Sequence, residues 1–220
     1  MKNYLVLLMT LLIFSKIEAQ RKIKYEINAG SAYLDLNNIN LNRKFGYQAG
    51  IGVDIKLGHH FYLNGQLNYQ RFRMDLNGLS RNELYYDFIE YKPKVNLSYL
   101  ILPIAIKYNI PKTHITLLAG AQINYKISGN VEYPNGVKVD TAIIFYKTTY
   151  NWFGGIEYNI PIRNNRSIFI NAKYYSSIGN GYNLNMSRHG YKSYGYLFTV
   201  GYRFYKYIIN STIEGRVNNQ

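Results

Sequence analysis

Apolar and polar residues alternate one by one through most of this 220-residue chain. Residues 44–57 show the pattern most fully, with Phe45, Tyr47 and Ile51 among the apolar set and Gln48 among the polar set. Because successive side chains of a strand point to opposite sides, a period of two predicts a β-strand with one apolar and one polar face. The segment is much longer than the about five or six residues of an average soluble strand.

The alternation recurs along the chain and predicts eight strands in all. Their ranges are 22–34, 44–57, 60–75, 96–108, 115–128, 149–160, 167–176 and 194–204. Tight connections at 57–60, 109–113 and 161–166 alternate with long ones at 35–43, 76–95, 128–148 and 177–193. In an antiparallel meander this order gathers the long loops at one end. Outer-membrane barrels have this arrangement, with short periplasmic turns, long outer loops and an even number of strands.

Two kinds of barrel would hide the apolar face: a soluble, lipocalin-like barrel points it inward, and a membrane barrel points it toward lipid. Strand glycines such as Gly50 and Gly201 suit a crowded interior on the polar side. Tyrosines near the strand ends suit the aromatic girdles of a membrane barrel. We therefore predict an all-β fold, an eight-stranded antiparallel up-and-down transmembrane β-barrel. Pro103 falls inside a predicted strand, where its missing N–H requires a bulge or distortion.

The first nineteen residues have the order of a secretory signal peptide. A short basic start precedes the apolar run from Tyr4 to Phe14, and a small residue, Ala19, precedes the expected cleavage point. The alternative, a membrane anchor, is disfavoured because that run would rise only about 16 Å as a helix, against a hydrocarbon core of about 30 Å. The expected organisation is a signal peptide at 1–19, a barrel at 20–204 and a polar tail at 205–220.

The run Tyr99-Leu-Ile-Leu-Pro-Ile-Ala-Ile-Lys-Tyr108 resembles a characteristic strand of the PorT-like outer-membrane β-barrel family of Bacteroidota. The segments 119–122, 153–158 and 172–175 resemble later strands of that family, and 201–204 resembles its closing strand. The chain differs in continuing beyond the closing strand as a tail. The resemblance implies an integral outer-membrane protein. One class of members assists type IX secretion, and many others have no known activity.

The polar faces carry charges that a barrel of eight strands would enclose among its side chains. They are Lys24, Glu26, Asp54, Lys56, Lys107, Glu157, Lys173 and Arg203. Because a buried charge requires a partner, we expect a structural ion-pair network across the lumen. A proton or ion path is the functional alternative.

No motif for catalysis or for cofactor or metal binding emerges from the sequence. The chain has no cysteine, and Ser and His occur without a nucleophile motif. His59 and His60 point apart in a tight turn and lack further ligands nearby, so we predict no metal there. The acidic residues of 75–90 lie among arginines and lysines, which is typical of a salt-bridged loop. We expect no enzymatic activity and no cofactor.

Lysine and arginine exceed aspartate and glutamate by 26 to 12, a formal charge of +14 that suggests an anionic partner. Export and strand-borne aromatics disfavour nucleic acid. Near the long-loop end we expect contacts with lipopolysaccharide phosphates from Arg43, Lys44, Arg71, Arg73, Arg81, Arg188 and Lys192. The predicted function is a non-enzymatic outer-membrane barrel, with a lumen filled by side chains, that serves envelope structure or assists a secretion or surface complex. A narrow pore or transporter is the alternative, and an outer-membrane enzyme comes third.

Overall fold

The computed structural model describes residues 23–36, 41–42, 45–76, 78–80, 89–91, 94–133, 136–140, 146–162, 166–178 and 192–205. The predicted signal peptide with its cleavage point after Ala19, and positions 206–220 of the predicted tail, lie outside these residues. The last barrel strand continues through Tyr205, one residue beyond the expected end of the barrel. Within the described residues, no helix is long and apolar enough to span a membrane.

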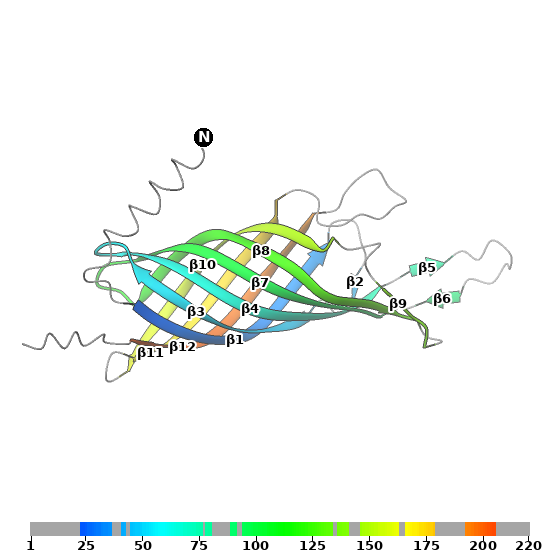
Figure 1. Cartoon of the computed structure of the whole chain (residues 1–220), viewed down its shortest axis with the longest axis horizontal. Helices are drawn as coiled ribbons and strands as arrows, with labels where there is room; N and C mark the ends of the chain where they lie inside the picture. The colour runs from blue at the N-terminus through cyan, green and yellow to red at the C-terminus, as the bar shows by residue number, and fades with distance from the viewer. Residues whose placement is uncertain are drawn as a thin grey trace, which may run out of the picture.

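Eight long strands form the body of the molecule (Figure 1). They are β1 (Ile23–Leu36), β3 (Phe45–Lys56), β4 (Phe61–Leu76), β7 (Lys94–Asn109), β8 (Ile115–Glu132), β10 (Thr148–Ile162), β11 (Arg166–Ser177) and β12 (Ser193–Tyr205). Each is antiparallel to its neighbour in this order, and the first pairs with the last, with Ala29 opposite Val200. The sheet is therefore closed, and the predicted eight-stranded up-and-down barrel is confirmed.

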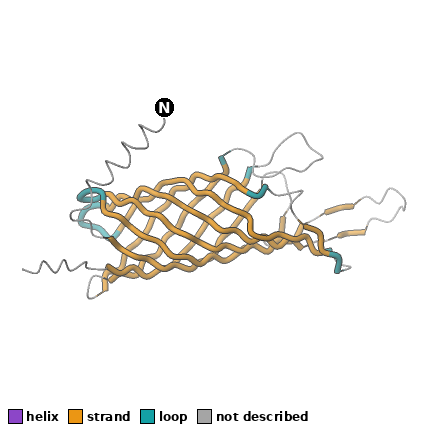
Figure 2. The backbone as a smooth tube through the Cα atoms, in the orientation of Figure 1, coloured by secondary structure: helices purple, strands orange, loops and turns teal. Residues whose placement is uncertain are grey.

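The two ends of the barrel differ as the connection lengths predict. The described tight turns at 57–60 and 110–114 lie at one end (Figure 2). The long connections at the other end carry β2 (Leu41–Asn42), β5 (Gly78–Ser80), β6 (Ile89–Tyr91) and β9 (Lys138–Asp140). Strand β2 pairs with β4, β9 extends the ladder of β8, and β5 and β6 form a separate two-stranded sheet. These short strands are absent from the sequence prediction, because none is long enough to show a period.

The apolar faces point outward, as predicted for a membrane barrel. Ile51 is 60% exposed and Ile104 is 61% exposed, whereas the inward-facing Asp54 is 2% exposed. Outward aromatic side chains cluster near both ends of the apolar band, for example Tyr47 with Tyr69 at the long-loop end, with ring centroids 6.3 Å apart. At the short-turn end, the Phe61 and Tyr108 rings lie 5.0 Å apart. These groups suit the two lipid–water boundaries.

Toward the long-loop end the outer face of the barrel wall becomes polar and the inner face becomes more apolar. On β4, Arg71 and Arg73 point outward and are exposed, whereas Phe72 and Met74 point inward and are buried. The inner cluster includes Leu97 and other apolar residues from several strands. The expectation of a polar inner face thus holds fully only for the half of the barrel nearer the short turns, and at the long-loop end the inner face is mixed. Beyond the lipid band the wall faces water, so its interior is apolar like that of a soluble barrel.

Pro103 coincides with an irregularity in the wall. The paired positions between β4 and β7 stop at Gly65–Ile104 and resume at Asn68–Ile101. On its other side, Pro103 remains opposite Gln122 of β8. The missing N–H of proline explains an interrupted ladder on one side only, and this is the strand distortion expected from the sequence.

Candidate functional site in the barrel lumen

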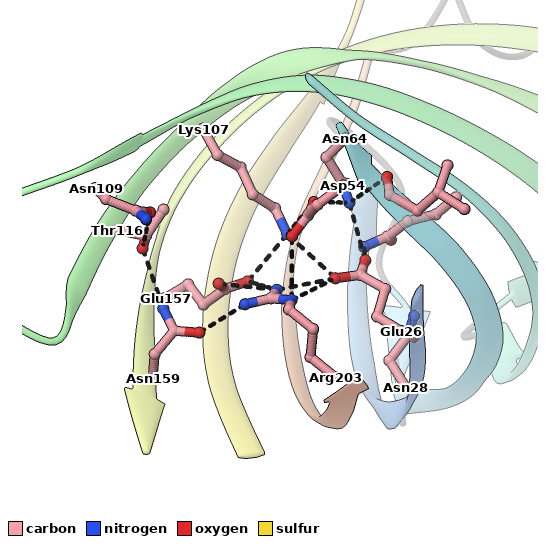
Figure 3. A network of polar contacts seen from close by, with 12 residues as sticks. Glu26, Asn28, Asp54, Asn64, Lys107, Asn109, Thr116, Glu157, Asn159 and Arg203 are labelled. Atoms are coloured by element: carbon pink, nitrogen blue, oxygen red, sulfur yellow. Dashed lines mark hydrogen bonds and ion pairs between the residues drawn. The ribbon is translucent and has the colours of Figure 1, made fainter. Parts of the chain in front are cut away.

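A cluster of charged side chains spans the lumen (Figure 3), in the half of the barrel nearer the short turns. It consists of Glu26 from β1, Asp54 from β3, Lys107 from β7, Glu157 from β10 and Arg203 from β12. Each residue occupies an inward position in the two-residue period of its strand, so the strand conformation itself points the side chain into the lumen. Their side chains are at most 4% exposed. We call these five residues the lumen cluster.

Both cations of the lumen cluster contact all three carboxylates. The Lys107 Nζ lies 3.3 Å from Glu26, 3.1 Å from Asp54 and 3.3 Å from Glu157. The Arg203 guanidinium lies 2.9 Å from Glu26, 3.0 Å from Asp54 and 3.0 Å from Glu157. Five strands are thus joined through one set of ion pairs. Because a buried charge is costly unless it is paired, removal of any one member should destabilise the whole arrangement.

Neutral side chains complete the hydrogen bonding of the lumen cluster. Asn64 donates to Glu26 at 2.9 Å and to Asp54 at 2.7 Å, and Gln66 also donates to Glu26. On the other side, Arg203 donates to the Asn159 Oδ1 at 2.6 Å, and Asn159 donates to Thr116. The three amides satisfy carboxylate lone pairs and a guanidinium proton that the ion pairs leave over, and the Thr116 hydroxyl accepts from Asn159.

Aromatic rings pack against the cationic groups. The Arg203 guanidinium lies 4.5 Å from the ring centroid of Phe169, which is fully buried. Gly201 provides the space for that ring, because a Cβ at this position would collide with it. Lys24 lies 4.1 Å from the Tyr62 ring centroid. Such contacts favour a cation over a ring face in a desolvated site.

The structure brings together five of the eight predicted lumen charges. Lys24 and Lys173 are also buried, 8% and 7% exposed, and Lys173 lies 5.4 Å from the Phe153 ring centroid. Lys56 is the last residue of β3, is only half buried and is not a member of the lumen cluster. The supporting residues Asn159, Thr116 and Phe169 were not singled out from the sequence. The two-residue period predicts that their side chains point inward, but their contacts depend on which strands face each other across the lumen.

The lumen is stratified along its axis. Next to the short turns, a cavity of about 310 Å³ reaches the lumen cluster and is lined by Lys24, Arg166 and Asn109 among others. Buried amides such as Asn28, Asn68 and Gln48 occupy the middle. The apolar cluster that contains Leu34, Phe72 and Leu97 fills the long-loop end. The short-turn end is therefore open and charged, whereas at the long-loop end the apolar cluster packs together with buried polar groups such as Asn151 and Ser193.

Of the seven predicted lipopolysaccharide contacts, Arg71, Arg73 and Lys192 are described and exposed. The other four, Arg43, Lys44, Arg81 and Arg188, lie outside the described residues. No group of three metal-ligating side chains that could hold an ion occurs among the described residues.

The family model for the outer membrane protein beta-barrel domain matches residues 18–183. The chain belongs to this family. It is an integral outer-membrane protein, and its apolar outer face is in contact with the lipid of that membrane.

Several solved outer-membrane proteins are similar at low identity. Ail, the attachment invasion locus protein of Yersinia pestis, is 14% identical, with 84% of this chain and 100% of that chain covered and a TM-score of 0.47. Neisserial surface protein A is 12% identical, with 84% and 99% covered and a TM-score of 0.48. OprG from Pseudomonas aeruginosa is 11% identical, with 86% and 97% covered and a TM-score of 0.44. No curated protein matches the sequence.

Proposed function

We propose that this protein is a non-enzymatic, non-conducting barrel that anchors a complex of the cell envelope in the outer membrane. The observation that carries the proposal is the lumen cluster, which ties β1, β3, β7, β10 and β12 together across the lumen. All three carboxylates are held by both cations. Groups engaged in this way suit a structural role better than proton transfer, which needs a group poised to exchange its proton.

Side chains on the long-loop side of the lumen cluster also support a closed lumen. Met74, Val95 and Leu97, which belong to the apolar cluster, are among the largest fully buried side chains. An eight-stranded barrel is just narrow enough for its side chains to fill the interior. A solute would have to displace the ion pairs and then pass the apolar cluster at the long-loop end.

Planar lipid bilayers test this proposal directly. We expect the purified full-length protein to insert without discrete conductance steps, while a porin in the same bilayers conducts. Insertion is verified separately by heat-modifiable gel mobility of the recovered protein. Reproducible single-channel steps from inserted protein would contradict the closed lumen.

One observation favours a narrow water-filled path as the second candidate. Four buried side-chain atoms have no hydrogen-bond partner among the described residues: the Oδ1 atoms of Asn28, Asn151 and Asn171, and the Nε2 of Gln48. Buried polar groups without protein partners are usually satisfied by water. Osmotic swelling of proteoliposomes separates the candidates: water permeation without ion conductance would indicate such a path.

The partner we propose is a protein of a secretion or surface complex. The resemblance of 99–108 to the PorT-like family suggests the type IX system, and the strands beyond the lipid band offer a protein-accessible region at the long-loop end. Affinity purification of a tagged chain from native membranes tests this, with identification of stoichiometric partners. Recovery of the barrel alone under mild detergent would argue for a solitary envelope protein.

Contact with lipopolysaccharide completes the proposal. Arg71 and Arg73 follow the aromatic Tyr69 on the outer face of β4, at the level where lipid phosphates meet the barrel. Guanidinium groups form strong charge-assisted hydrogen bonds with phosphate. We include Lys192 and the predicted Arg43, Lys44, Arg81 and Arg188 in this contact.

A further inference from the structure

An apolar hollow of about 590 Å³ lies on the lipid-facing wall of the barrel. Its floor runs across β3, β4, β7 and β8 through Val53, Gly65, Ile104 and Ala121, which are successive register partners. Gly65 creates the depth, because a Cβ at this position would have no heavy atom within 4 Å. We call this hollow the wall groove.

The wall groove climbs from the middle of the lipid band to its outer boundary. Gly65 lies midway along β4 between Phe61 and Tyr69, the aromatic residues that end its apolar outer face. At its other end are Tyr150, near the start of β10, and Ile178, whose N–H donates to the Tyr150 carbonyl. From Gly65 on β4 to β10, three strand spacings of about 4.8 Å give about 14 Å across the wall, which is of the same order as the about 15 Å of half a bilayer hydrocarbon core.

A cation stands at the outer end of the wall groove. Lys147 is exposed, and its Nζ lies 5.3 Å from the ring centroid of Tyr125. Tyr125 follows Ile123 on the outer face of β8, and Ile123 lies opposite Tyr150 in the groove. The site therefore combines an apolar channel within the membrane with a positive charge at headgroup level.

We propose that the wall groove binds one acyl chain of an outer-leaflet lipopolysaccharide molecule and that Lys147 contacts its phosphate. From Gly65 to Tyr150 the groove lies in the half of the band nearer the long loops, which face outward in barrels of this kind. An acyl chain in the groove gains more van der Waals contacts than it has among the mobile chains of the bilayer. The Lys147 ammonium group neutralises a phosphate of the same lipid. This inference rests on the proposed lipopolysaccharide contact and adds a defined chain site and Lys147 to it.

The only tryptophan of the chain provides the reporter. Trp152 lies on the outer face of β10 opposite the groove residue Ala121 and is 47% exposed. Full-length protein folded in maltoside micelles would be titrated with purified lipid A while Trp152 emission is recorded. Phosphatidylglycerol, which also carries acyl chains and a phosphate, would be titrated in parallel.

We expect a saturable emission change with lipid A and a weaker response to phosphatidylglycerol. Gly65→Leu fills the groove, and exclusion of about two methylene groups should weaken binding about tenfold. Lys147→Ala should weaken it about threefold, as expected for loss of one exposed charge contact. Ala172→Leu, on the outer face of β11 and outside the groove lining, is the matched control and should leave affinity unchanged.

Heat-modifiable gel mobility verifies that each variant is folded. Equal affinity of Gly65→Leu and Ala172→Leu would overturn the proposal, as would equal affinity for phosphatidylglycerol. Failure of the groove is distinguishable from failure of the broader lipid contact. If lipopolysaccharide retention depends on Arg71 and Arg73 but not on Gly65, the acyl-chain site in the groove is refuted and the proposed function is unaffected.

Discussion

Lys107→Met removes one of the two cations on which the lumen cluster depends. Formally, three carboxylates and two cations give the cluster a charge of −1, and the substitution leaves −2 with Arg203 as the remaining cation. The three contacts of the Lys107 Nζ, at 3.1 to 3.3 Å, are lost together. Methionine restores much of the volume, so the loss is mainly electrostatic.

Removing one partner from a buried ion pair costs about 3–5 kcal/mol, which lowers the folding equilibrium constant about 10² to 10⁴-fold. Urea unfolding in phosphocholine vesicles, followed by heat-modifiable gel mobility, measures the free energy of unfolding. Lys56→Met is the matched control, because this half-buried lysine is on the same inner face but outside the lumen cluster. It should cost less than about 1 kcal/mol.

A second substitution tests whether charge imbalance causes the loss. Glu157→Gln in the Lys107→Met background returns the formal charge of the cluster to −1. We expect recovery of at least about 1 kcal/mol, within the range of coupling energies for residues in contact. A Lys107→Met loss no larger than that of Lys56→Met, or no recovery in the double variant, would refute the reasoning.

Three further outcomes follow from other features. Gly201→Leu should prevent folding in a heat-modifiability assay, because the Phe169 ring occupies the space of the new side chain; Gly65→Leu, facing lipid, should fold. Arg71→Glu with Arg73→Glu should reduce the lipopolysaccharide that co-purifies, measured by phosphate analysis, by at least about threefold; unchanged retention would exclude this contact. Leu97→Ala should lower the free energy of unfolding by about 2–5 kcal/mol, since this side chain is fully buried in the apolar cluster.

The sequence was sufficient for the wall of the barrel but not for its interior contacts. A strand's two-residue period assigns each side chain to a face, so the inward phase of Glu26, Asp54 and Lys107 was predictable without a structure. The same period does not predict which residues of different strands lie at the same level along the barrel axis. Lys56 and Asp54 share a face on β3, yet only Asp54 reaches the cluster. Strand tilt and stagger decide this, and they are properties of the closed sheet.

The exchange of faces on β4 was present in the sequence and fixes the level of the outer lipid boundary. Leu67 and Tyr69 are outward and apolar or aromatic, and Arg71 is outward and charged, while the inward residues change from Gln70 to Phe72. Because lipid demands an apolar exterior and water a polar one, both faces must change where the solvent changes. The boundary therefore lies between Tyr69 and Arg71. This level places the lumen cluster within the membrane and Phe72 and Met74 of the apolar cluster at and beyond its surface. The long-loop end, which faces outward in barrels of this kind, is then the closed end of the lumen, and the charged cavity opens at the short-turn end.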